Sequence, residues 1–162
     1  MKKLILFLVF AFLSLSSTAF ADIKTEADML KKDLISFHNK MAAYQREESE
    51  PSNTMYNKLY TDQAGELFVF TNISRAYLNY ARFLLDEIKW LKLDSDNELV
   101  RGYLKNSLSN FNKEGEFYVK YLAYHIEFAK NLEMTKKLQI LKEDIAALHT
   151  KIKKFSDNIS TK

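Results

Sequence analysis

Apolar residues recur at alternating spacings of three and four in four segments of the chain, the pattern of one buried face of an α-helix. The first seam lies within residues 25–47 and the last follows residue 135, and each predicts a helix with one apolar side. Thr25-Glu26-Ala27-Asp28 resembles a capping box with Asp in place of Glu, so the first helix is expected to begin there. The two seams consist of Ala27, Leu30, Leu34, Phe37, Met41 and Tyr44, and of Leu138, Leu141, Ile145, Leu148, Ile152, Phe155 and Ile159.

Two central segments, residues 54–93 and a segment that begins near Glu98, carry a second apolar stripe beside the main seam. The wide apolar face of the first predicts an inner helix that touches two or more neighbours. The main seams are Phe70, Ile73, Tyr77, Tyr80, Leu84, Ile88 and Leu91, and then Leu104, Leu108, Phe111, Gly115, Tyr118, Leu122, His125, Ala129 and Leu132. The flanking stripes are Val69, Ala76, Phe83 and Trp90, which recur every seven residues, and Phe117, Tyr121, Tyr124 and Phe128.

Short connections separate these segments, and short connections make consecutive helices antiparallel neighbours. The connection at 131–135 contains neither Gly nor Pro. A continuous helix there would place the two adjoining seams on opposite sides, so a reversal is expected instead. The prediction is an all-α fold, an elongated antiparallel (up-down-up-down) four-helix bundle with long central helices.

The expected helix lengths do not match. The outer helices have about 23 to 25 residues, or roughly 35 Å, and the central two have about 36 to 40, or roughly 55 Å. The central hairpin is therefore expected to project about 20 Å past its partners, or to fold back at Gly65 and Gly115, which lie at similar heights. These glycines are either paired kinks or positions that let bulky neighbours approach.

The chain begins with the three parts of a secretory signal peptide. Lys2 and Lys3 precede an apolar run over residues 4–13, and Ala19-Phe20-Ala21 forms an A-x-A cleavage site. An apolar core of about ten residues is too short for a membrane span, which takes roughly 20. We therefore expect residues 1–21 to be a cleaved signal peptide and residues 22–162 to form one helical domain. The product is expected to be periplasmic or secreted, with no membrane span.

Charge and composition narrow the function further. Removal of Lys2 and Lys3 lowers the formal net charge of +3 by two, and the cluster near the C-terminus, residues 151–154, suits the last turns of a helix. Nucleic-acid binding is therefore not expected. The chain has no cysteine and a single proline. The first absence excludes thiol catalysis, disulfides and c-type haem attachment, and so few helix breakers leave little room for a β-rich fold.

Three histidines, His38, His125 and His149, lie on or beside the seams at comparable heights and are candidate ligands for zinc or copper. Met29 and His149 resemble the haem ligands of cytochrome b562, an exported four-helix bundle, and that resemblance implies a haem held between the first and last helices. Met29, however, falls about 120° from the centre of the first seam and is expected to face solvent. We therefore expect structural or exposed histidines and no cofactor.

No nucleophile elbow, phosphate loop or metalloprotease motif is present, so the chain is not expected to be an enzyme. The leading hypothesis is an exported helical interaction protein of the bacterial envelope. The alternative is a bundle that binds a small molecule, a metal or haem in its interior. A projecting central hairpin would expose apolar side chains to a protein partner or a second copy. The residues expected near that contact are Trp90, Phe83, Ile88, Leu91 and Tyr103.

Overall fold

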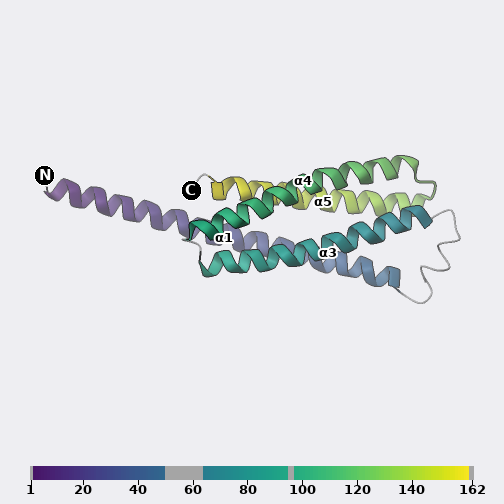
Figure 1. Ribbon diagram of the computed structural model, residues 1–162, viewed down its shortest axis with the longest axis horizontal. Helices are drawn as coiled ribbons and strands as arrows, with labels where there is room; N and C mark the ends of the chain where they lie inside the picture. Colours follow the sequence, from purple (N-terminus) through teal and green to yellow (C-terminus); the bar gives the residue numbers. More distant parts are fainter. Residues whose placement is uncertain (1, 50–63, 95–96, 161–162) are drawn as a thin grey trace.

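The computed structural model describes the backbone of residues 2–49, 64–94 and 97–160, and the side chains of residues 23–46, 65–94 and 97–159. This part of the chain forms four helices and contains no strand. The helices are α1 (Lys2–Ser49), α3 (Ala64–Leu93), α4 (Glu98–Phe128) and α5 (Leu132–Ser160). They lie side by side in one elongated bundle, and the N-terminal part of α1 extends beyond it (Figure 1). The prediction of an all-α bundle is confirmed.

Polar pairs between helices define their directions. Asp33 of α1 pairs with Lys151 of α5 at 2.7 Å, and one stretch further along α1, Lys40 pairs with Asp144 at 2.6 Å. Residue numbers rise along α1 as they fall along α5, so these two helices are antiparallel. Packing is closest between α1 and α3 and between α4 and α5, and looser between α3 and α4. The bundle therefore consists of two tight helix pairs that meet along more open seams.

Asparagine side chains cap the two helices that follow short turns. The Asn97 side chain accepts a hydrogen bond from the backbone N–H of Leu99 at 3.0 Å, which caps α4. The Asn131 side chain accepts one from the backbone N–H of Met134, also at 3.0 Å. Each asparagine satisfies an N–H group that the first turn of a helix leaves unpaired. The reversal expected at 131–135 occurs at 129–131, just before α5 begins.

The expected projection of the central hairpin, by about 20 Å, is wrong. The helices α3, α4 and α5 have 30, 31 and 29 residues, so their lengths nearly match. Lys92, beside the turn between α3 and α4, forms a 2.6 Å ion pair with Asp28 of α1. Ile159, near the end of α5, is buried in the core. Both outer helices therefore reach the level of the turn between α3 and α4. The helix α5 is long enough because it already begins at Leu132, and α1 is long enough because it continues through Thr25 without a break.

Two further expectations about helix starts change. The sequence from Lys2 to Ser49 contains no Gly or Pro, and α1 is continuous there, so the pattern at Thr25 does not begin a helix. Gly65 is the second residue of α3, and open space surrounds the position that a Cβ would take. It therefore lies in the first turn of α3 as the structure describes it. The expected first turns of this helix, residues 54–63, lie outside the described residues.

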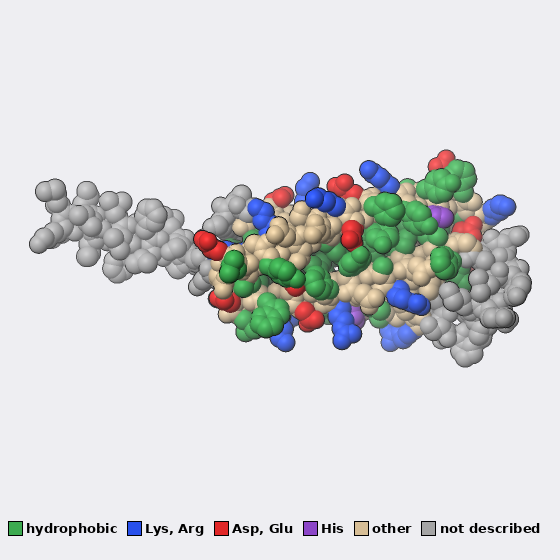
Figure 2. All heavy atoms as spheres, in the orientation of Figure 1, with side chains coloured by type: hydrophobic (Ala, Val, Ile, Leu, Met, Phe, Trp, Pro, Cys, Tyr) green, Lys and Arg blue, Asp and Glu red, His purple; other side chains and the backbone are tan. Residues whose placement is uncertain are grey.

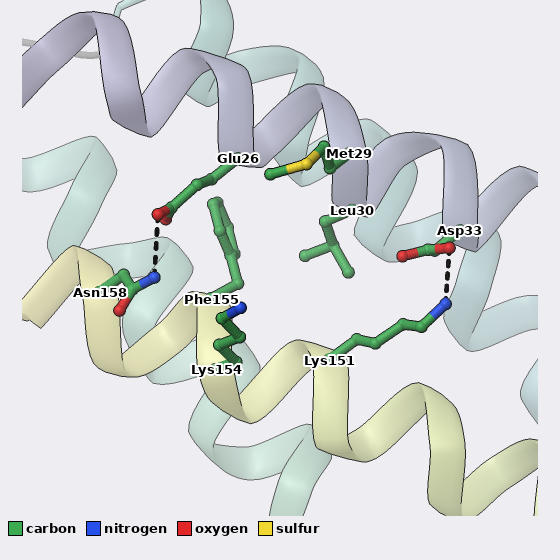
Figure 3. Close-up of a pocket in the computed structure, with 8 residues that line it drawn as sticks. All are labelled: Glu26, Met29, Leu30, Asp33, Lys151, Lys154, Phe155 and Asn158. Carbon is green, nitrogen blue, oxygen red and sulfur yellow. Dashed lines mark hydrogen bonds and ion pairs between the residues drawn. The ribbon is translucent and has the colours of Figure 1, made fainter.

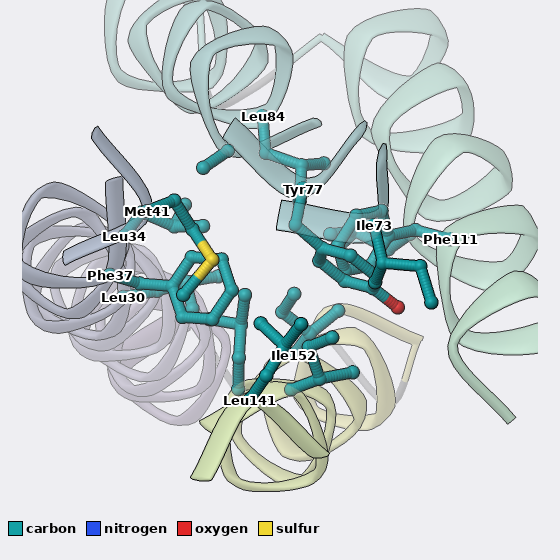
Figure 4. Packing of buried hydrophobic residues seen from close by; sticks show 14 of the residues in the cluster. Leu30, Leu34, Phe37, Met41, Ile73, Tyr77, Leu84, Phe111, Leu141 and Ile152 are labelled. Atoms are coloured by element: carbon teal, nitrogen blue, oxygen red, sulfur yellow. The ribbon is translucent and has the colours of Figure 1, made fainter. Parts of the chain in front are cut away.

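The expected seams of all four helices meet in one hydrophobic core (Figure 4). The end of the seam expected on the third helix is the exception, because His125 and Ala129 are only half-buried and Leu132 is 70% exposed at the start of α5. Tyr77 of α3 lies near its centre, with its ring centroid 5.9 Å from that of Phe37 of α1 and 5.8 Å from that of Phe111 of α4. Edge-to-face contacts at such distances add to the stabilisation that burial itself provides. Full burial of one large apolar side chain contributes about 1.5–3 kcal/mol. Most of the apolar residues that recur at helical spacing are therefore buried in this core.

Candidate interaction face

Exposed aromatic side chains lie along the open seam between α3 and α4. Trp90 on α3 is 66% exposed, and on α4 Tyr103 is 60% and Phe117 62% exposed. Such side chains are usually buried, so a row of them on one side of the molecule is unusual for a surface that meets only water. We call this surface the aromatic face. It comprises Phe68, Phe83 and Trp90 of α3, and Tyr103, Phe117, Tyr121, Tyr124 and Phe128 of α4.

The exposed residues of α4 have the spacing of a helix–helix contact. Phe117, Tyr121, Tyr124 and Phe128 follow one another at intervals of four, three and four. Knobs-into-holes packing between helices uses this spacing, because it keeps every side chain on the side that faces the partner helix. The core seam of α4, which includes Phe111 and Leu122, is filled by the bundle. The helix therefore carries a second seam of the same kind that the bundle leaves open.

Ring contacts hold the side chains of this second seam in place. The rings of Phe117 and Tyr121 stack with centroids 5.9 Å apart, and those of Tyr124 and Phe128 lie 4.8 Å apart. His125 connects the two pairs through its contact with Tyr121 at 4.5 Å. Figure 2 shows apolar side chains gathered over the C-terminal half of α4. Side chains ordered in this way lose less conformational entropy on binding, so the surface is partly preorganised.

The surface between α3 and α4 has a hollow at each end and is filled by packed side chains in its middle. Near the start of α3 a hollow is lined by residues of both helices, including Phe68, Phe117 and Tyr121. Near the turn between α3 and α4 a second hollow is lined by Glu87, Trp90, Leu99, Val100, Tyr103 and Leu104. Between them the ring of Tyr80 packs on that of Phe111 at 5.4 Å. A hydrogen bond between Tyr80 and Glu114 raises the pKa of this tyrosine.

The structure divides the residues expected at an interaction surface. Trp90, Phe83 and Tyr103 are exposed on the aromatic face. Ile88 and Leu91 are buried, with exposed fractions of 0% and 1%, because they belong to the core seam of α3. The expectation that these two contact a partner is corrected by their burial. Sequence reasoning did not select the α4 stripe from residue 117 to residue 128, although its spacing beside the core seam was visible.

His149 forms a half-buried polar cluster with Tyr77 and Asn112, which sequence reasoning did not bring together. The Tyr77 hydroxyl lies 2.9 Å from His149 Nε2, and Asn112 Oδ1 lies 3.2 Å from His149 Nδ1. A neutral imidazole protonated at Nδ1 satisfies both, because it donates to Asn112 and accepts from Tyr77. The ring also stacks on Phe111 with centroids 4.6 Å apart. Burial lowers the pKa of His149 to about 4, so the ring is neutral at neutral pH.

Gly115 makes room for this imidazole. A Cβ at residue 115 would overlap the Cε1, Nε2 and Nδ1 atoms of His149, so only the absence of a side chain lets α4 approach the ring. Of the two roles considered for Gly115, the close approach of a bulky neighbour is therefore the one observed. No signal within α4 alone identifies His149 as that neighbour, because the two residues meet only across the bundle.

The three histidines do not come together. His38 is half-buried on α1, and His125 contacts the ring of Tyr121 on α4. His149 is hydrogen-bonded to Tyr77 and Asn112. Within residues 23–46, 65–94 and 97–159 no three His, Asp or Glu side chains are grouped so that they could hold a metal ion. Met29 is 55% exposed, as its position off the seam predicted. A haem held between Met29 and His149 therefore has no support in the structure.

A third hollow lies between α1 and α5 (Figure 3). Two polar pairs cross it, Asn158 donating to Glu26 at 2.9 Å and Lys151 pairing with Asp33 at 2.7 Å, while Phe155 stands between them. The second carboxylate oxygen of Glu26 is buried and has no hydrogen-bond partner among the described residues. Because it is covered, an incoming ligand cannot reach it without displacing its surroundings. The pairs therefore act mainly to fasten α1 to α5.

No protein-family model matches this chain, and comparisons with curated proteins and with solved structures find no match. Among the residues whose side chains the structure describes, no helix has the length and apolar character needed to cross a membrane. The most distinctive feature of the described surface is the aromatic face.

Proposed function

We propose that this chain is an exported, non-enzymatic interaction protein of the bacterial envelope, and that its aromatic face binds an amphipathic helix of a protein partner. The observation that carries the proposal is the second apolar seam of α4, exposed beside α3 and spaced for a helix–helix contact. Export is inferred from the signal-peptide pattern of residues 1–21.

Both the residue types and their arrangement favour a helical partner. Aromatic residues, above all Trp and Tyr, are the commonest anchors of protein interfaces, and an extended exposed apolar surface marks an association site. A groove between two helices can accept a third helix whose apolar residues recur every three or four positions. Trp90 and Tyr103 at one end of the seam and Phe117 and Tyr121 at the other offer anchors for both ends of such a helix.

The interior offers less to a ligand than the face does. The centre of the bundle is filled by packed aromatic rings. The ring centroid of Tyr77 lies 5.8 Å from that of Phe111 and 5.5 Å from that of Tyr118. The half-buried polar groups there are already engaged, because His149 bonds to both Asn112 and Tyr77. These observations favour binding at the surface over binding of a small molecule or haem within the bundle.

Site-specific photo-crosslinking in the native cell tests the proposal. A photoreactive phenylalanine analogue replaces Phe117 in one strain and Tyr124 in another, and Ala123 in a control strain. Ala123 is exposed on the same helix, and it lies at no spacing of three or four from a residue of the second seam. We expect both face positions to form a crosslink to one protein partner and the control position to form none.

Charge substitution on the face gives the matching negative result. Phe117→Glu, combined with the photoreactive residue at Tyr124, should abolish the crosslink, whereas Ala123→Glu should leave it unchanged. The proposal fails if the crosslink is absent from both face positions, or if it is equally strong from the control position. Crosslinks to lipid alone would contradict a protein partner and indicate that the face binds a membrane surface. Crosslinks to the chain itself would indicate that the face binds a second copy.

A further inference from the structure

We propose that the hollow beside the turn between α3 and α4 holds a lysine or arginine side chain of the partner helix. The inference rests on the proposed function, because it names the chemistry that the partner must present at one end of the aromatic face. It predicts a partner helix that is apolar along its length and carries a cation where it reaches Trp90 and Tyr103.

The hollow combines apolar walls with aromatic rings and one acid. Leu99, Val100 and Leu104 of α4 form the apolar part of the lining, and Glu87 and Trp90 of α3 lie opposite, with Tyr103 beside them. Its volume is about 360 Å³, which is ample for the end of a long side chain. Trp90 and Tyr103 are both more exposed than buried, so an incoming group can reach their rings.

The charge in the hollow is negative and unpaired. Glu87 is the one charged residue of the lining, and no described residue forms a hydrogen bond or an ion pair with its carboxylate. Lys92, one turn further along α3, is engaged by Asp28 of α1 at 2.6 Å. Partial desolvation and the neighbouring Asp86 raise the pKa of Glu87, which means that its charged form lacks compensation. A cation placed beside it would supply that compensation.

The aromatic rings select the same kind of group. The π-face of an aromatic ring carries partial negative charge, and Trp and Tyr attract ammonium and guanidinium groups more strongly than Phe does. A lysine or arginine side chain also has an apolar stem that suits Leu99 and Leu104. An acidic side chain would instead meet Glu87, and a wholly apolar one would leave the carboxylate without a counter-charge. The lining therefore fits a long cationic side chain best.

The fluorescence of Trp90 makes the hollow directly observable, because Trp90 is the single tryptophan of the chain. The probe is N-acetyl-lysine methylamide, and its neutral counterpart is N-acetyl-norleucine methylamide, which has a similar stem and no charge. Each is titrated into the purified protein at constant ionic strength while the emission of Trp90 is recorded. We expect the lysine probe to change the emission with a half-saturation on the order of 10 mM, and the norleucine probe to bind at least about threefold more weakly.

Two variants with matched controls identify the groups responsible. Glu87→Gln should weaken the lysine probe about fivefold and leave the norleucine probe unchanged, whereas Glu116→Gln, at an exposed position outside the hollow, should change neither. Tyr103→Leu should also weaken the lysine probe, while Phe117→Leu at the far end of the face should not. Equal responses to the two probes, or no effect of Glu87→Gln, would overturn the cation site. Photo-crosslinking at Phe117 and Tyr124 would still report on the binding face independently.

Discussion

Replacement of Gly115 by alanine is the sharpest single test of how α4 packs on α5. The new Cβ would overlap three atoms of the His149 ring, so either the ring or the helix has to move. The ring cannot turn away freely, because Phe111 stacks on it and both of its nitrogens are hydrogen-bonded. Gly115→Ala should therefore disturb the whole cluster, although alanine is the better helix former.

The magnitude follows from three effects. Overpacking of a filled site costs about 1–3 kcal/mol, and disruption of two hydrogen bonds costs about 1 kcal/mol each. The higher helix propensity of alanine offsets about 1 kcal/mol. We expect a net loss of about 2–4 kcal/mol in the free energy of unfolding, which corresponds to a fall in Tm of roughly 10 °C for a domain of this size.

Gly102→Ala supplies the matched control, because Gly102 lies in the same helix with open space around it. That substitution should be neutral or stabilise the protein by up to about 1 kcal/mol. Urea unfolding is measured for both variants and for each of them combined with His149→Ala. The differences give the interaction free energy between residue 115 and His149. In the background without the imidazole, Gly115→Ala should cost much less. A Gly115→Ala variant as stable as Gly102→Ala would refute the packing described for His149.

Three further predictions follow from the core and the face. Because burial lowers the pKa of His149 from 6.5 to about 4, the unfolded chain takes up a proton first as the pH falls. The free energy of unfolding should therefore fall by about 1–2 kcal/mol from pH 7.5 to pH 5, the partial exposure of the ring included. Chemical denaturation should show that His149→Gln removes this pH dependence, whereas His38→Gln preserves it. Leu91→Ala should cost about 2–5 kcal/mol in the same assay, because Leu91 is buried, whereas Trp90→Ala should stay within about 0.5 kcal/mol. Tyr77→Phe should cost about 1–2 kcal/mol in thermal unfolding, because it leaves His149 Nε2 without its donor.

Periodicity along the chain was enough to predict the helices and most of the core. A residue such as Leu141 or Ile145 recurs at helical spacing whatever its partners are, and burial follows from that spacing. The lengths of the helices were harder to predict, because the start of α5 depends on the cap that Asn131 provides. The height of the turn between α3 and α4 relative to its neighbours also depends on where α5 ends and on the continuation of α1 past Thr25, which no local pattern encodes.

The residues of the candidate face were predicted only in part, for a related reason. Trp90, Phe83 and Tyr103 were selected because the hairpin was expected to project, yet they are exposed because α3 and α4 pack loosely along the full seam. The stripe from Phe117 to Phe128 was recognised as aromatic, but a stripe beside a core seam is buried or exposed depending on the neighbouring helix. The cluster of Tyr77, Asn112 and His149 joins three helices, so no spacing within one of them reveals it.

The proposed function requires that the aromatic face is open in the isolated protein and covered by a partner in the cell. Hydroxyl-radical footprinting read by mass spectrometry tests it directly, because Trp90, Tyr103 and Phe117 react readily when they are accessible. We predict strong oxidation of these residues in the purified protein and marked protection in intact cells. Met29, exposed on α1, should be oxidised in both. Equal oxidation of the face in the purified protein and in cells would contradict the claim.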